Sequence, residues 1–177
     1  MSWYVIDVES DNQSPSVGSM VCFGIVKIDT KLKTTFYGQT KPIMDMFDPE
    51  ALAISGFSRE EHLTFDDPKI VMKQLRDWIK QTNKKGTKAV FLSDNNSFDA
   101  QWINFYFHKY LGENPFGFSS RRIGDLYCGL VKNVNANREW KKFRKTKHDH
   151  HPVNDAIGNA EALISFSKKY GLKIPIE

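Results

Sequence analysis

Two carboxylates inside the first apolar segment constrain the fold of this chain more than any other feature. Residues 3–9 are rich in β-branched and aromatic side chains and predict a short strand that carries Asp7 and Glu9. Side chains two positions apart project from the same face of a strand, so these carboxylates are expected about 6–7 Å apart on one side. Such a strand is expected in mid-sheet, where burying two acids is costly unless divalent cations neutralise them. For the pair taken alone, an edge strand with solvated acids is the alternative.

Further apolar segments predict a mixed α/β sheet flanked by helices. The other strands are expected at residues 20–28, 34–40, 88–93 and about 122–125. The helices are expected from Pro68 to the turn at 84–86, and at about 98–110, 126–134 and 152–169. Short connections between the first three strands indicate that these strands are antiparallel. The order βββαβαβα therefore predicts a five-stranded mixed sheet.

Length and composition limit the classes of protein that remain. The 177 residues, of which 40% are hydrophobic and 26% charged, suffice for one sizeable core, so we expect a single domain over residues 1–177. No apolar run approaches the ~20 residues of a membrane span, and Asp7 and Glu9 interrupt any signal peptide. Only Cys22 and Cys128 are present, which excludes a disulfide framework and an all-cysteine zinc site. We therefore expect a reducing, cytoplasmic setting without a membrane.

A second acidic motif follows the strand predicted at 88–93. Residues 94–99 read DNNSFD, and the C-terminal end of such a strand is where ligands tend to bind in α/β sheets. Asp94 or Ser97 can serve as the cap of the next helix, which is the alternative for either residue. Asp99 is harder to explain by capping, because it lies in the first helical turn directly after an apolar phenylalanine that should anchor the helix.

A third motif combines histidines with a carboxylate at the start of the last predicted helix. Residues 148–156 read HDHHPVNDA. Pro152 suits the first turn of a helix, which leaves the histidines on the preceding loop and puts Asp155 about one turn further on. A mobile histidine beside a helix-borne carboxylate suits a general base next to a metal ligand. The alternative is a zinc site made by the three histidines and Asp149, although no cysteine pair or second histidine-rich segment supports it.

The basic side chains are concentrated in one segment. Residues 138–147 carry six lysines or arginines and a single acid, Glu139, so this segment holds a net charge of +5 in a chain whose total is +4. Trp140 and Phe143 are interleaved with these cations. Such a patch is typical of a surface that binds a polyanion, and a solvated basic loop is the alternative.

Together, the three motifs resemble those of the DEDDh branch of the DnaQ-like 3′–5′ exonucleases. The first family motif is Asp-x-Glu on the first strand, which Asp7 and Glu9 match. The second is an Asn four positions before an Asp at the start of a helix, which Asn95 and Asp99 match. An aromatic residue usually precedes that Asp, and Phe98 occupies this position.

The third family motif is a His five positions before an Asp, with small residues following on the helix. His150 and Asp155 have this spacing, whereas His151 is one position out of register. The resemblance also extends between the motifs, because residues 48–58 resemble the family insert after the third strand and residues 122–126 resemble its short fifth strand. It thus covers nearly the whole chain.

This resemblance implies a ribonuclease H-like fold and a 3′–5′ exonuclease that hydrolyses the terminal phosphodiester of single-stranded DNA or RNA and releases nucleoside 5′-monophosphates. It implies two divalent cations, Mg²⁺ or Mn²⁺, as cofactors. The expected metal ligands are Asp7, Glu9, Asp99 and Asp155, with His150 as the general base. The residues expected to bind the 3′ end of the nucleic acid are Val8, Ser10, Asn95, Lys142 and Arg144.

Two other functions are compatible with the same residues. One is a phosphodiesterase that acts on very short oligonucleotides, and the other is a catalytically silent nucleic-acid-binding module. DNA and RNA are not distinguished, because that choice depends on contacts to the 2′-OH. The chain is expected to be a monomer or a homodimer. The histidines outside the motifs, His62 and His108, are expected to have ordinary surface or capping roles.

Overall fold

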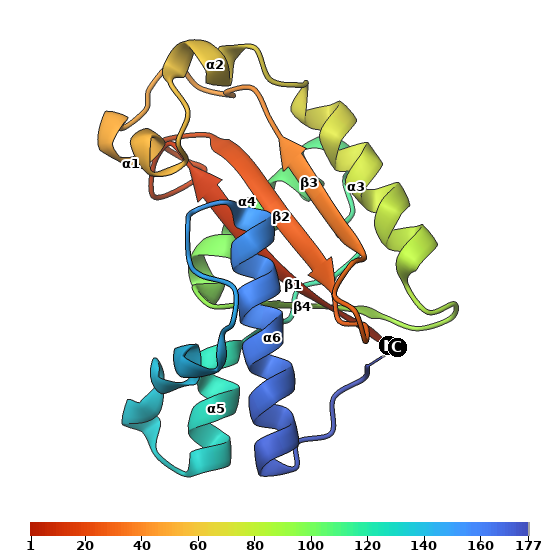
Figure 1. The fold of residues 1–177 in the computed structure, drawn as a ribbon. Coiled ribbons are helices and arrows are strands. Elements are labelled where there is room, and N and C mark those ends of the chain that lie inside the picture. The colour runs from red at the N-terminus through yellow and green to blue at the C-terminus, as the bar shows by residue number, and fades with distance from the viewer. Residues whose placement is uncertain (177) are drawn as a thin grey trace.

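A five-stranded mixed sheet forms the centre of the computed structural model, which describes residues 1–176 (Figure 1). The strands are β1 (Ser2–Ser10), β2 (Met20–Lys27), β3 (Thr35–Gln39), β4 (Ala89–Ser93) and β5 (Ser120–Arg122). They lie in the order β3-β2-β1-β4-β5. The pairs β1–β2 and β2–β3 are antiparallel, whereas β1–β4 and β4–β5 are parallel. The predictions of a mixed sheet, of three antiparallel first strands and of a central first strand are therefore confirmed.

Helices follow β3, β4 and β5 along the chain. They are α1 (Pro49–Ile54), α2 (Arg59–Leu63), α3 (Pro68–Thr82), α4 (Asn96–Leu111), α5 (Ile123–Val131) and α6 (Pro152–Tyr170), with 3₁₀ turns η1 (Val134–Ala136) and η2 (Glu139–Phe143). A proline occupies the first turn of α3 and of α6, where its missing N–H and fixed φ suit a helix start. Across residues 1–176, no helix combines the length and apolar character required to cross a bilayer.

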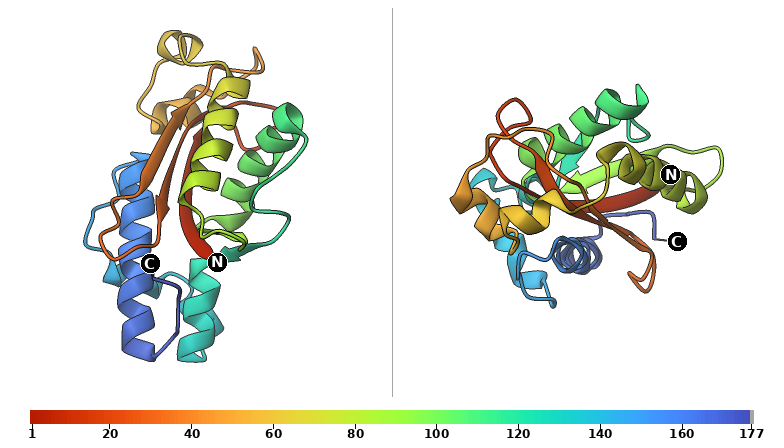
Figure 2. Two further views of the ribbon diagram at one scale, coloured as in Figure 1. Left: turned by 90° about the vertical axis from the view of Figure 1, so that its right-hand side faces the viewer. Right: turned by 90° about the horizontal axis from the view of Figure 1, so that it is seen from above.

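Helices cover both faces of the sheet (Figure 2). The alternation of side chains along β1 divides the core into two layers, one on each face. Tyr4, Ile6 and Val8 face α3 and α4, where they join a cluster that contains Leu75, Ile79, Trp102, Tyr106 and Phe107. Trp3 and Val5 face the other side, where they join Tyr127 of α5 and Ala156, Ala160, Leu163 and Phe166 of α6. Because the alternation continues along the strand, Asp7 and Glu9 lie on the face covered by α6.

Helix α6 approaches the sheet closely at its first turn. Gly24 of β2 lies opposite Asp7 in the antiparallel ladder. A Cβ atom added at Gly24 would lie 2.5 Å from the carbonyl oxygen of Pro152, and closer still to the amide nitrogen of Val153. A glycine inside a strand often marks such an approach of another backbone segment. This contact brings the start of α6 next to the acidic end of β1.

The last strand differs from the prediction. It ends at Arg122, and α5 begins at Ile123, so the strand expected at about 122–125 is displaced toward the N-terminus. The physical reason is that Ile123 and Tyr127, four positions apart on one helix face, are both buried in the second core layer. Burial of Ile123 and Tyr127 on one helix face therefore stabilises a helix where the local sequence alone predicts a strand.

The surface or capping role expected of His62 is wrong. His62 lies on α2 with 0% exposure, its Nδ1 atom 3.8 Å from a carboxylate oxygen of Asp11 and its Nε2 atom 3.4 Å from the carbonyl oxygen of Met20. Burial lowers the pKa of His62 to about 4, so the imidazole is neutral in the fold at pH 7. His108, in contrast, is exposed in the last turn of α4, as expected.

Candidate active site

Three carboxylates meet where β1 ends beside the first turn of α6. Asp7 and Glu9 project from β1, and Asp155 projects from α6. One oxygen from each of these groups lies within 4.8 Å of the other two. Asp155 is fully buried, whereas Asp7 and Glu9 are partly accessible. The fold thus brings together acids that are far apart in the chain.

The fourth predicted acid, Asp99, lies in the first turn of α4 and is 2% exposed. Its Oδ1 atom accepts a hydrogen bond from the backbone amide of Val8 at 3.2 Å, which attaches it to the same stretch of β1. Its Oδ2 atom is buried and has no hydrogen-bond partner among residues 1–176. A buried carboxylate oxygen without a donor is costly and calls for an additional ligand such as a cation or water.

Burial and repulsion between neighbouring acids disfavour the charged forms of Asp7, Glu9 and Asp99. Burial raises the pKa of Asp7 well above its usual range, and the charges of Asp99 and Asp155 raise it further. For Glu9, burial and then the charges of Asp7 and Asp155 raise the pKa to about 8. Burial also raises the pKa of Asp99 to about 8. The site therefore fits a divalent cation, because such an ion offsets this repulsion and an all-oxygen donor set suits Mg²⁺ or Mn²⁺.

The loop before α6 places His150 beside these carboxylates. The backbone of His150 is left-handed, with φ of 60°, and its amide donates a hydrogen bond to Oδ2 of Asp155 at 3.1 Å. Its ring Nδ1 atom lies 3.6 Å from Oε1 of Glu9, and 49% of its side chain is exposed. A non-glycine residue holds a positive φ only where its surroundings stabilise it, and the hydrogen bond to Asp155 does so here. The imidazole therefore borders both the acidic cluster and the solvent.

Asp149 organises this loop through hydrogen bonds within it. Its Oδ1 atom accepts from the amide of His151 at 3.0 Å, and its Oδ2 atom accepts from the side-chain amide of Asn154 at 2.8 Å. The ring of His151 stacks on Tyr37, with the ring centroids 5.2 Å apart.

The alternative zinc site made by three histidines and Asp149 is therefore not formed. Among residues 1–176, the histidines that do share metal-ligand spacing with an acid form the group His148, His150 and Asp155.

The guanidinium of Arg144 contacts the carboxylate of Asp155. Its Nη2 atom lies 2.7 Å from Oδ1 of Asp155, its Nη1 atom donates to Oδ1 of Asn159 at 2.9 Å, and its Nε atom donates to the carbonyl of Thr146 at 3.3 Å. Only 11% of the side chain is exposed. Gly158 makes room for it, because a Cβ atom there would lie 2.6 Å from Nε of Arg144. The predicted contact of Arg144 with nucleic acid stays a prediction, but its guanidinium already binds Asp155.

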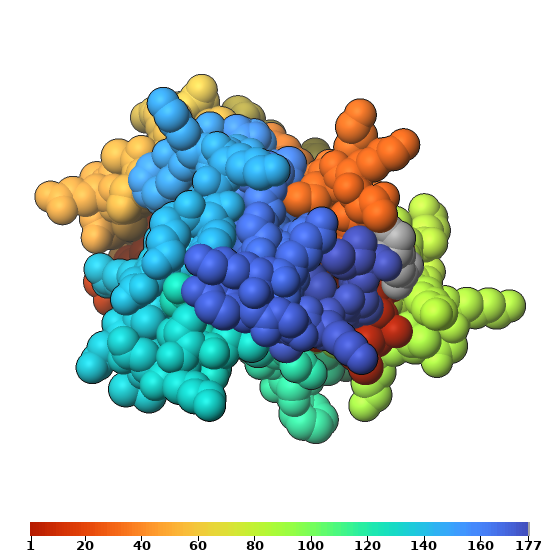
Figure 3. Space-filling model, turned by 60° about the horizontal axis from the view of Figure 1, so that its bottom comes forward, coloured from red at the N-terminus to blue at the C-terminus, as the bar shows by residue number. Residues whose placement is uncertain are grey.

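The segment around Arg144 is hydrogen-bonded to α6, and the two lie against each other at the surface (Figure 3). The carboxylate of Glu161 accepts hydrogen bonds from the amides of Lys145 and Thr146 at 3.0 and 2.8 Å. Trp140 is fully buried, and its indole donates to the carbonyl of Asn137 at 3.0 Å. The basic segment is therefore an ordered arm, anchored by Trp140 in the core layer beneath α6.

The other residues predicted to bind nucleic acid lie around the same end of β1. The Val8 amide is engaged by Asp99, and Ser10 is buried in the last position of β1. Asn95 is exposed at the start of α4 and makes no side-chain capping bond. Lys142 is exposed and lies 3.3 Å from Glu139. Contacts of these residues with nucleic acid stay predictions.

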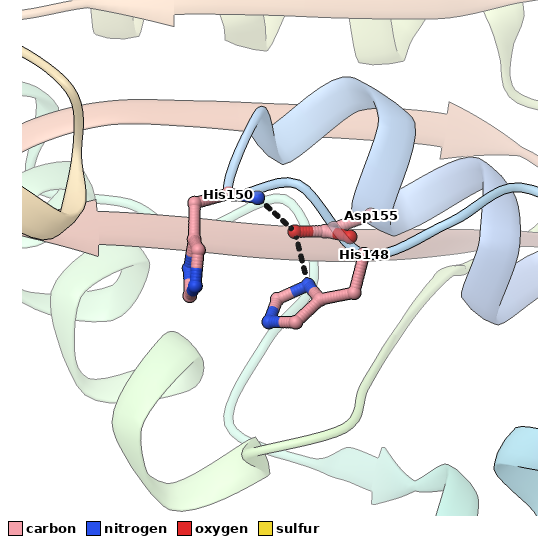
Figure 4. A group of neighbouring side chains, drawn as sticks. All are labelled: His148, His150 and Asp155. Carbon is pink, nitrogen blue, oxygen red and sulfur yellow. Dashed lines mark hydrogen bonds and ion pairs between the residues drawn. The ribbon is translucent and has the colours of Figure 1, made fainter.

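Several features of the site were not identified from the sequence. His148 places its Nδ1 atom 2.6 Å from Oδ2 of Asp155, from the same loop as His150 (Figure 4). Gly24 and Gly158 make room for α6 and for Arg144, respectively. A lone glycine inside an apolar strand was the available signal for Gly24, whereas nothing in the pattern of residues indicated which acid His148 and Arg144 would contact.

Comparisons with known proteins identify the family and the fold of the chain. No protein-family model matches the chain. A curated relative, the 3′–5′ DNA exonuclease Cap18 of Escherichia coli, is 33% identical over 168 residues, which cover 88% of this chain and 86% of that protein. The nuclease domain of 3′hExo, a DEDDh family member bound to rAMP, is similar with a TM-score of 0.77 and 17% identity over 99% of this chain and 96% of that one.

Exonuclease I of E. coli in complex with a dA16 oligonucleotide is also similar, with a TM-score of 0.67 and 16% identity over 95% of this chain and 41% of that one. At these identities the two solved structures show a shared fold. The relative at 33% identity, matched over most of both chains, shows the family. The chain is therefore a 3′–5′ exonuclease that belongs to the DEDDh family of the DnaQ-like superfamily.

Proposed function

We propose that this exonuclease hydrolyses the terminal phosphodiester of single-stranded nucleic acid and releases nucleoside 5′-monophosphates in a metal-dependent reaction. The observation that carries the proposal is the convergence of Asp7, Glu9 and Asp155 within 4.8 Å, next to the loop that holds His150. Asp99 completes the set of acids from the start of α4.

Asp7, Glu9, Asp99 and Asp155 are the residues that would hold two divalent cations, Mg²⁺ or Mn²⁺. When bound, such cations would lower the pKa of the attacking water and neutralise the charge that develops on the phosphate. The raised pKa values of Asp7 and Glu9 and the unpartnered Oδ2 atom of Asp99 support this assignment. Each of these groups gains from a neighbouring positive charge.

His150 acts as the general base and accepts the proton of the attacking water. Its backbone is held by the hydrogen bond to Asp155, while its half-exposed ring can reach a substrate that enters from solvent. Its Nδ1 atom lies 3.6 Å from Oε1 of Glu9, so the ring borders the acids that would hold the cations. The exposed ring can then release this proton to water.

Arg144 is a positioning residue in this scheme. It binds one carboxylate oxygen of Asp155, whose other oxygen remains directed toward the loop of His148 and His150. Arg144 thereby fixes the orientation of Asp155 before substrate binds, so the carboxylate does not have to be ordered during the reaction.

Single-stranded DNA is the first substrate to test, because the relative at 33% identity is named a DNA exonuclease. The ordered basic arm at 138–147 borders the site and supports contact with a phosphate backbone, with Lys142 among its exposed cations. We include residues 1–177 in one exonuclease domain, since both core layers pack on a single sheet.

Digestion of matched 3′-labelled single- and double-stranded DNA and RNA, with and without Mg²⁺, tests this function. We expect Mg²⁺-dependent release of mononucleotides from the 3′ end of single-stranded DNA, and loss of this release in Asp7→Asn. Asp77→Asn on α3 is the matched control, because it removes the same charge at a position 45% exposed and outside the site.

Three outcomes would contradict the proposal. Release of mononucleotides by Asp7→Asn at a near-normal rate would show that this carboxylate is not needed for hydrolysis. Hydrolysis restricted to the shortest members of a substrate length series would indicate an oligonucleotide phosphodiesterase. Binding of DNA by folded protein without Mg²⁺- or Mn²⁺-dependent hydrolysis would indicate a catalytically silent module.

A further inference from the structure

A second group of potential metal ligands overlaps the acidic cluster at one residue. His148, His150 and Asp155 each offer an atom that lies within 4.8 Å of the other two (Figure 4). Both imidazoles belong to the loop before α6, and their ring centroids are 4.3 Å apart. His148 already binds Oδ2 of Asp155 through Nδ1 at 2.6 Å.

The chemistry of this group differs from that of the acidic cluster. Two imidazole nitrogens and one carboxylate oxygen are the donors that Zn²⁺ and neighbouring transition-metal ions prefer, whereas Mg²⁺ prefers oxygen donors alone. The side chains of His148 and His150 are 55% and 49% exposed, so an ion has access and a fourth position remains open to water. Arg144 holds Oδ1 of Asp155, whereas Oδ2 contacts Nδ1 of His148 and the backbone amide of His150.

We propose that His148, His150 and Asp155 form an inhibitory site for a transition-metal dication such as Zn²⁺. The inhibitory effect, but not the binding, depends on the function proposed above. An ion bound there would take the lone pair that His150 needs to accept a proton. It would also take the carboxylate oxygen that Asp155 would otherwise offer to the acidic cluster.

The shared residue couples the two sites. Asp155 belongs both to the group with His148 and His150 and to the group with Asp7 and Glu9. Mg²⁺ bound by the acids therefore weakens the binding of Zn²⁺ at the histidines, and the reverse holds to the same extent, because coupling between two sites is reciprocal.

His148→Asn is the variant that separates the two sites. Its side-chain amide can replace Nδ1 as a hydrogen-bond donor to Asp155, but it is a poor ligand for Zn²⁺. His151→Asn is the matched control, because His151 lies on the same loop, stacks on Tyr37 and stands outside both groups.

The first test is isothermal titration of the metal-free full chain with Zn²⁺, together with the visible absorption of bound Co²⁺. We expect His148→Asn to weaken Zn²⁺ binding by about tenfold or more and to reduce the Co²⁺ absorption, while His151→Asn binds as the wild type does. Equal affinity in wild type and His148→Asn would overturn the proposed site. This measurement does not require nuclease activity, so its failure is distinct from failure of the proposed function.

The second test is inhibition of the Mg²⁺-dependent activity by Zn²⁺. The Zn²⁺ concentration for half inhibition should rise in His148→Asn in parallel with the binding constant, and in the wild type it should rise as Mg²⁺ is increased. Inhibition that is unchanged in His148→Asn would place the inhibitory ion elsewhere, and inhibition independent of Mg²⁺ would overturn the shared role of Asp155.

Discussion

Replacement of Gly24 by alanine is expected to disable the active site without altering any of its side chains. Gly24 lies opposite Asp7 in the β1–β2 ladder and directly beneath the first turn of α6. The added methyl group would lie 2.5 Å from the carbonyl oxygen of Pro152, and closer still to the amide nitrogen of Val153. These are backbone atoms, which cannot rotate away as a side chain does. The start of α6 must therefore move away from the sheet.

The size of this movement follows from the contact itself. Restoring an ordinary van der Waals separation requires a displacement of about 1 Å at the first turn of α6. Asp155 and the amide of His150 move with the helix, whereas Asp7 and Glu9 stay on β1. A misplacement of about 1 Å among catalytic groups costs roughly 100-fold in rate. Overpacking of a well-packed contact costs about 1–3 kcal/mol of stability, which lowers Tm by about 2–12 °C in a chain of this size.

The assay is kcat for release of mononucleotides from 3′-labelled single-stranded DNA, measured well below the unfolding transition so that unfolding does not contribute. Thermal denaturation measures the stability. Gly129→Ala on α5 is the matched control, because a Cβ atom there meets no heavy atom within 4 Å. It should keep full activity and gain up to about 1 kcal/mol from helix propensity. A Gly24→Ala protein with the rate and Tm of the wild type would refute the reasoning.

Three further perturbations test the site and its surroundings. Asp7→Asn is expected to lower kcat by about 100-fold or more and, in EDTA at pH 8, to raise Tm. The raised pKa of Asp7 means that folding at pH 8 must either bury its charge or take up a proton, and the neutral amide removes this cost. Denaturation scans with and without Mg²⁺ check this, and a lower Tm would contradict it. Arg144→Lys is expected to lower kcat by about tenfold or more with little change in KM, because an ammonium group cannot replace the guanidinium that binds Asp155 and Asn159 together. Steady-state kinetics check this, and an effect on KM alone would indicate a role in substrate binding instead. The pKa of His62 is lowered to about 4 from an ordinary value of 6.5, so the unfolded chain takes up a proton first as the pH falls, and the free energy of unfolding decreases between about pH 6.5 and 4, by up to about 3 kcal/mol. Denaturant unfolding should show a smaller decrease with falling pH in His62→Gln than in the wild type, and an equal decrease in both proteins would contradict this origin.

Much of the fold and the acidic site could be predicted because the signals are local. Asp7 and Glu9 share a face since side chains in a strand alternate, and this holds whatever lies above the strand. Pro152 marks the start of α6, which places Asp155 in its first turn. The order of strands and helices then limits how these elements can pack, so the meeting of the acids at one end of β1 was predictable as well.

Other features were decided by contacts between segments that are distant in sequence. His62 is buried because α2 packs over the loop that follows β1, which no local pattern records. The end of β5 is set by burial of Ile123 and Tyr127 in the layer beneath α6.

The clearest division lies between the acids and the groups that position them. The local pattern of residues was enough to predict which acids would gather at the end of β1, because their order and local conformation follow from strand alternation and the first turns of helices. Only the tertiary structure decided that Arg144 and His148 bind Asp155 and that Gly24 admits α6. The physical reason is that a charged side chain or a glycine has no preferred partner until packing brings one within reach.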